Sequence, residues 1–320
     1  MQGYHFNIDE RPVSCWDWKL NLKNMEFLDG IDALYFQYIA EQNVNNLDDD
    51  ENKHKAAISL RVAYSQSLET LFALLCSAVQ SPQCTVGWML NYKNSELIRI
   101  IKKISKKEFV YSRLKEKYVS WFNISKAIHH YFGNDSQKKD MIIKGYGSLW
   151  ARFASEYTDS AFSYEYNSIK HGLRVNPGGF QLAVGHEDIP GNPAAPEKMI
   201  NLGGSDFGSS FFVKEKITGT PKHNFRPRRY SRNWDPIHIA NRLSLISMSI
   251  NNVVNWLKLI NGKKPERCKF LNPENLNHLD EPWDKFSGPS SISMDLNIDK
   301  ANINTATKDE IIKSYKREEA

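Results

Sequence analysis

Apolar residues recur at helical spacing through most of this chain. Between residues 52 and 80 they lie three or four positions apart, and from Leu71 onward nearly every position is apolar. This spacing predicts a long helix whose second half is buried, and Pro82 ends it. The same spacing predicts further helices over residues 28–40, 94–132 and 137–171. The pattern therefore predicts a helical bundle.

The composition changes after residue 172. Residues 172–219 hold nine of the 17 glycines, and residues 179–184 and 209–214 have the apolar and β-branched content of short strands. We expect a β-rich, Gly/Pro-rich excursion over residues 173–234. An excursion of about 60 residues in a compact domain usually serves binding or catalysis.

A helix is predicted to return to the bundle over residues 235–262. Asp235 is a suitable N-cap, Pro236 suits the first helical position and Gly262 suits the end. The fold class expected is mainly α, a bundle with a β-rich excursion and a polar C-terminal tail. The predicted segments are an N-terminal segment (1–51), the bundle (52–172), the excursion (173–234), the returning helix (235–262), and a linker and tail ending in a short helix (263–320).

Composition and charge limit the partners, the location and the cofactors that we expect for this protein. The 320 residues carry a net charge of +5, which permits a nucleic-acid partner without requiring one. The start of the chain lacks a signal-peptide pattern and the longest apolar run is too short to span a bilayer, so a cytoplasmic protein without a membrane partner is expected. No cysteine pair or His-rich spacing predicts a metal or a cofactor. Trp16 and Trp18 are expected to pack against the core.

One short stretch concentrates groups that could do chemistry. On a helix, Asn167 and His171 share a face, and Lys170 flanks it. A His can move the proton of a ribose 2′-OH or of the leaving 5′-oxygen, while Lys170 and Arg174 stabilise charge on the phosphate. The alternatives are a binding role, or a His171 that caps the helix by bonding a carbonyl or a neighbouring tyrosine, with Lys170 and Arg174 solvated.

Two other groups are candidates for RNA contact. Residues 216–234 contain six cations and no acid, with aromatic residues interleaved, which is the composition that single-stranded RNA requires. The predicted RNA-binding residues are Arg226, Arg228, Arg229, Arg232 and Tyr230. A basic surface loop is the alternative. Arg61 and Glu69 form a polar stripe on the helix of residues 52–80, which either pairs internally or supports the His171 group.

The stretch from Tyr166 to Gly172 resembles the signature of the HEPN superfamily. Asn167 falls on its polar position and His171 on its His, while Tyr166 occupies the position of its Arg. The resemblance implies an all-α domain, a homodimer that builds its site from two motif copies, and metal-independent endoribonuclease activity in phage defence or a toxin system. The alternative is a non-catalytic helical module that binds a nucleotide, RNA or a protein partner such as an antitoxin.

Overall fold

The computed structural model describes residues 2–114, 116, 118–131, 136–187, 189–217, 223–280, 288–294 and 306–316. The chain forms two compact units. The first comprises Met1–Tyr166 and Asp235–Lys285, and the second comprises Asn167–Trp234 and Phe286–Ala320.

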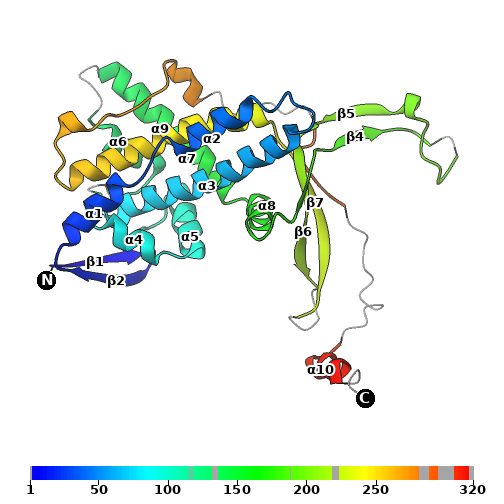
Figure 1. The fold of residues 1–320 in the computed structure, drawn as a ribbon, viewed down its shortest axis with the longest axis horizontal. Helices are drawn as coiled ribbons and strands as arrows, with labels where there is room; N and C mark the ends of the chain where they lie inside the picture. Colours follow the sequence, from blue (N-terminus) through cyan, green and yellow to red (C-terminus); the bar gives the residue numbers. More distant parts are fainter. Residues whose placement is uncertain are drawn as a thin grey trace. The chain divides into compact units, whose positions relative to one another are not determined.

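The fold is mixed α/β, so the expected mainly α bundle is wrong. The described residues form eight strands in three sheets in addition to the helices (Figure 1). The error has two physical sources. The sequence pattern did not predict the paired strands at the N-terminus, and strands of the β-rich excursion join a strand of the predicted linker and tail in one four-stranded sheet.

The first unit is built around α3 (Lys53–Gln80), the helix predicted over residues 52–80. Its second half is buried on almost every side, because α9 (Pro236–Ile260) and α2 (Tyr35–Val44) pack along it (Figure 1). Among the described residues, α3 is the one helix that is long and apolar enough to cross a membrane, and most of its apolar stretch is buried inside the protein. The other long helices of the unit are α1 (Leu20–Asp29), α4 (Thr85–Asn91), α5 (Asn94–Ser105), α6 (Trp121–His129), α7 (Ser136–Tyr157) and α8 (Ser160–Lys170), the last of which crosses into the second unit. Two short 3-10 helices, Pro265–Arg267 and Leu276–Leu279, follow α9.

The predicted cap of α9 is confirmed. The Asp235 carboxylate accepts hydrogen bonds from the backbone N–H groups of Ile237 and His238 at 2.8 and 3.2 Å. Two otherwise unpaired donors at the helix start are thereby satisfied, and Pro236 lacks a third.

The N-terminal segment forms an antiparallel hairpin of β1 (Gln2–Ile8) and β2 (Arg11–Asp17). Alternation along the strands buries Phe6 and Ile8. Trp16 lies on the opposite face and is 55% exposed, while Trp18 lies beyond the strand and is 76% exposed. Both tryptophans are thus largely exposed, and the Trp16 ring packs within the hairpin, over Gly3 and beside the His5 ring, and not in the core.

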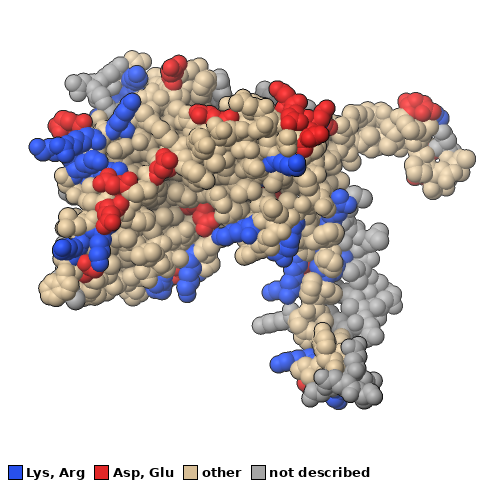
Figure 2. All heavy atoms as spheres, in the orientation of Figure 1, with Lys and Arg blue, Asp and Glu red and all other residues tan. Residues whose placement is uncertain are grey.

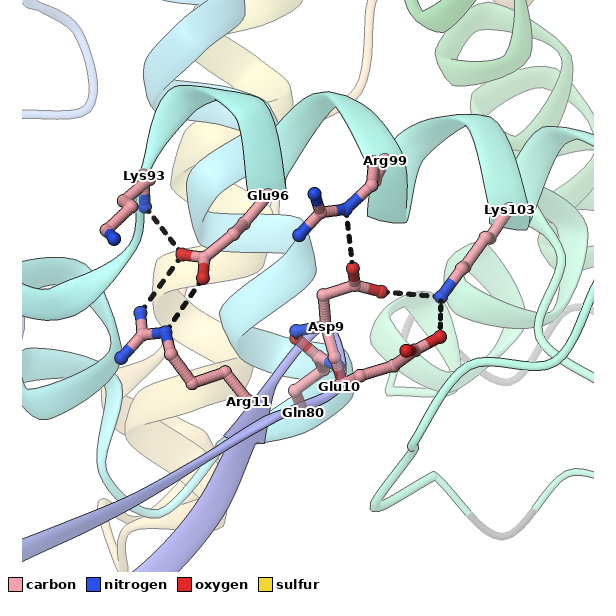
Figure 3. A network of polar contacts seen from close by, with 8 residues as sticks. All are labelled: Asp9, Glu10, Arg11, Gln80, Lys93, Glu96, Arg99 and Lys103. Carbon is pink, nitrogen blue, oxygen red and sulfur yellow. Dashed lines mark hydrogen bonds and ion pairs between the residues drawn. The ribbon is translucent and has the colours of Figure 1, made fainter.

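A polar network fastens this hairpin to α5 (Figure 3). Asp9, in the turn between the strands, accepts from Arg99 at 2.8 Å and from Lys103 at 2.7 Å. Arg11 donates to both carboxylate oxygens of Glu96 at 2.8 and 3.0 Å. These contacts join residues about 90 positions apart and determine where the hairpin lies on the helices.

The second unit contains a four-stranded antiparallel sheet in the order β3–β6–β7–β8. Its strands are Val175–Pro177, Gly208–Lys216, Phe225–Asn233 and Ser291–Met294. Most of the basic segment, for which a surface loop was one alternative, forms a strand, β7, and part of the predicted linker and tail supplies β8. A separate pair, β4 (Gln181–Val184) and β5 (Ile200–Gly204), the short 3-10 helix Pro196–Lys198 and the helix α10 (Lys308–Lys316) complete the unit.

Candidate functional site

The predicted motif lies at the C-terminal end of α8. The His171 N–H donates to the carbonyl of Asn167 at 3.1 Å, and the Arg174 N–H donates to that of Ser168 at 2.8 Å. Between them Gly172 takes a φ of 109°, a conformation that costs glycine little and other residues much. The helix therefore ends in a tight reversal that leaves His171 directly after its last turn.

The motif's polar side chains are exposed at this reversal. Asn167, Lys170, His171 and Arg174 all lie on the surface, on the exposed positions of the helix and the following turn. Among the described residues, the side chains of Asn167, His171 and Arg174 have no hydrogen-bond or ion-pair partner. A His171 that bonds a carbonyl or a tyrosine, one of the alternatives from the sequence, is thus not what the described contacts show. This end of α8 can meet an anionic ligand.

Tyr166 belongs to the first unit and is buried. Its hydroxyl donates to Glu69 Oε2 at 2.9 Å. Burial raises the pKa of the Tyr166 phenol, and the negative charge of Glu69 raises it further. The phenol therefore stays neutral and cannot supply the positive charge that an Arg would carry at this position. Its visible role is to hold α8 against α3.

Arg61, which was proposed to support the His171 group, is instead buried and paired with acidic residues. Its guanidinium donates to Glu165 Oε2 through Nη2 at 2.6 Å and through Nε at 3.1 Å, and both side chains are almost fully buried. Glu156 lies 3.6 Å from the same guanidinium and accepts from the Tyr64 hydroxyl at 2.8 Å. The charge of Arg61 is thereby neutralised inside the first unit.

Strand β7 divides the predicted RNA-binding residues between two faces of the sheet. Arg226 and Arg228 lie on one face, where both pair with Glu215 of β6. Tyr230 and Arg232 are half-buried on that face, and the Arg228 guanidinium lies 5.3 Å from the centroid of the Tyr230 ring. Of the predicted set, only Arg229 projects from the opposite face, where it is exposed. The five residues therefore do not form one surface.

Two aromatic residues share a face with Arg229: Phe225, one of the interleaved aromatic residues noted in the sequence but not among the predicted RNA-binding residues, and Phe212, which sequence reasoning missed. Phe212 of β6 lies directly opposite Arg229 in the antiparallel register, and Phe225 opens β7 on the same side. Figure 2 shows Lys and Arg side chains along the β6–β7 hairpin. The apolar and β-branched content of residues 209–214 was the available signal for a strand, but it carries no information about the partner strand.

Within the part of the chain that the structure describes, no group of three His, Cys, Asp or Glu side chains is placed to hold a metal ion.

Comparison with known proteins gives no relative for this chain: no family model, no curated protein and no solved structure matches it.

Proposed function

We propose that this protein acts on RNA and that the exposed end of α8 contacts the phosphodiester backbone. The observation that carries the proposal is the joint exposure of Asn167, His171 and Arg174, without partners among the described residues, beside the exposed Lys170. Cations, an amide and an imidazole in one short surface segment match the charge and hydrogen-bonding groups of RNA. An RNA ligand also fits the cytoplasmic location expected from the sequence.

In the leading version of this proposal, the protein cleaves RNA without a metal. The His171 imidazole removes the 2′-OH proton, the 2′-oxygen attacks phosphorus, and the bond to the 5′-oxygen breaks to leave a cyclic phosphate. A protonated imidazole then returns a proton to the departing 5′-oxygen, while Lys170 and Arg174 stabilise the phosphate charge. The resemblance to HEPN proteins implies a homodimer, in which a second copy could provide the second imidazole.

The second candidate is an RNA-binding module without cleavage. The position of Tyr166 favours this binding module, because a buried neutral phenol occupies the position at which HEPN proteins have an Arg. Arg61 does not replace that charge, since Glu165 neutralises it.

The test compares wild-type protein with His171→Ala and with His130→Ala, an exposed histidine of the first unit that serves as the matched control. Each is incubated with total RNA in EDTA. We expect cleavage by wild type and His130→Ala and none by His171→Ala. Cleavage that persists in His171→Ala contradicts the mechanism. RNA retention without cleavage by any of the three proteins supports the binding module. If none of the three retains or cleaves RNA, the whole proposal is contradicted.

A further inference from the structure

The β6–β7 hairpin sorts its side chains into two sharply different faces. The register is continuous over nine residue pairs, so alternate residues of each strand share a face. Phe212 pairs with Arg229, Lys214 with Pro227, and Lys216 with Phe225. These six residues form one side of the hairpin, which we call the open face.

On the opposite face of the hairpin, side chains are buried or paired with other residues of the protein. Phe211 is buried and Val213 nearly so, and the only carboxylate of the hairpin, Glu215, lies on this side. Glu215 accepts from Arg226 and Arg228, and the two arginines hold its pKa below the usual value. The acid of the hairpin is therefore paired with two arginines, away from the open face.

The open face combines exposed rings with cations. Phe212 is 61% and Phe225 is 51% exposed, although both are large apolar side chains. Lys214, Lys216 and Arg229 are exposed beside them, and no Asp or Glu of β6 or β7 lies on this face. The Lys214 ammonium lies 4.7 Å from the centroid of the Phe225 ring, a cation–π contact that joins the two strands on this face.

We infer that the open face is a stacking platform for single-stranded nucleic acid. Aromatic side chains stack on bases of any sequence, and nearby cations pair with the phosphates that join those bases. Four strand residues separate the two rings along the sheet, roughly 13 Å at the rise of a β-strand, so one extended strand could meet both rings. Bases in a duplex are paired and stacked on one another, so they cannot stack on the two rings.

The positive charge of the open face favours single-stranded nucleic acid over an apolar protein surface as its ligand. Two isolated rings among three cations do not make a continuous apolar patch, and the face has no acid of its own to repel phosphates. The inference rests on the proposed function for its choice of RNA, but it uses residues other than those at the end of α8. Binding and cleavage can therefore fail separately.

The experiment measures the affinity of the full chain for a labelled single-stranded RNA of about 12 nucleotides, within the usual site size for such surfaces. Duplex RNA and single-stranded DNA of the same sequence are the comparison ligands. The variants are Phe212→Ala, Phe225→Ala and both together. Phe109→Ala, an exposed phenylalanine of the first unit, is the matched control.

We expect each platform variant to weaken single-strand binding about tenfold, given the worth of base–aromatic stacking, and the double variant to weaken it further. Phe109→Ala should bind as wild type does, and the melting temperatures should agree because all three rings are exposed. The affinity for single-stranded DNA should also fall in the platform variants, since stacking on a base does not depend on the sugar.

Two results would overturn the platform alone: unchanged affinity in the double variant, or a duplex affinity equal to that for the single strand. His171-dependent cleavage could survive either result. If the wild-type protein binds no nucleic acid of any form, both the platform and the proposed function fail.

Discussion

Arg61 Nη2 lies 2.6 Å from Glu165 Oε2, and this pair joins α3 to α8 across 104 residues of sequence in a site where both side chains are almost fully buried. Removing one partner leaves an uncompensated buried charge, which costs about 3–5 kcal/mol. We therefore expect Arg61→Ala to lower the free energy of unfolding by that amount, measured by urea denaturation.

The control for this prediction is Asp50→Ala, which removes the exposed partner of Lys53. Exposed pairs contribute little because water screens them, so no clear loss is expected. The double variant Arg61→Met with Glu165→Leu should recover most of the loss, since apolar residues of similar size replace both charges. A loss in Arg61→Ala no larger than that in Asp50→Ala would contradict this account of the pair.

His129 should make the protein sensitive to acid. Its ring stacks on Tyr146 at a centroid distance of 4.4 Å and is fully buried. Burial lowers its pKa from 6.5 to about 3. The unfolded chain therefore binds one more proton than the folded chain between these values, so stability is complete above about pH 6.5 and is lost as the pH falls toward 3.

The slope from this one group approaches about 1.4 kcal/mol per pH unit within that window. Denaturation at a series of pH values measures it, and His129→Gln should have a shallower slope because the amide does not titrate there. His130→Gln, which changes the exposed neighbour, should keep the wild-type slope. Equal slopes in all three proteins would show that His129 is not the titrating group.

Tyr166→Phe separates a structural role from a catalytic one. The variant removes the hydroxyl that donates to Glu69 and keeps the ring. A lost hydrogen bond to a charged carboxylate costs about 1.5–3 kcal/mol, while any RNA cleavage rate should stay unchanged because the phenol is buried. Tyr38→Phe, at an exposed position, serves as the control for stability. Loss of cleavage with unchanged stability would instead place the phenol in the reaction.

Gly87 of α4 lies where a side chain does not fit. A Cβ atom there would lie 2.8 Å from Cys84 Sγ and 3.2 Å from Cys15 Sγ. We expect Gly87→Ala to lower the free energy of unfolding by about 1–3 kcal/mol, as overpacking does, and Cys84→Ala to restore part of it. Gly30→Ala, whose new atom would come no closer than 3.5 Å to its neighbours, should cost nothing. Equal melting temperatures for the two glycine variants would contradict the crowding.

Arg228 and Arg229 are adjacent in sequence but should respond differently to charge reversal. Arg229→Glu places an acid on the open face and should weaken RNA binding and reduce its salt dependence. Arg228→Glu places a second carboxylate beside Glu215, so its main effect should be a lower melting temperature. Filter binding over a range of salt concentrations, with thermal melts of the same samples, distinguishes the two. Equal effects on affinity would indicate that the hairpin binds RNA without regard to face.

Local patterns in the sequence were sufficient for the long helices. The predicted spans of α3 and α9 match the structure closely, because helical periodicity, an N-cap at Asp235 and a proline stop act over a few residues. That Asn167 and His171 lie four positions apart near the end of a helix also followed from local spacing, whereas their exposure did not. Each of these features depends only on residues near it in the chain.

Pairing between distant segments could not be predicted in this way. The turn of the β1–β2 hairpin is held by Arg99 and Lys103 of α5, about 90 residues away, and the hairpin buries Phe6 and Ile8. The contacts that occupy Arg61 and Tyr166 also join separate helices. A polar stripe on one helix does not reveal which partner will neutralise it.

The basic segment shows the same division most clearly. Its sequence determined that six cations and three aromatic residues lie close together without an acid. Only the pairing of β7 with β6 decided that Arg226 and Arg228 turn toward Glu215 while Arg229 joins Phe212 and Phe225. The physical reason is that a strand alternates its side chains between two faces, and the neighbouring strand determines what each face meets.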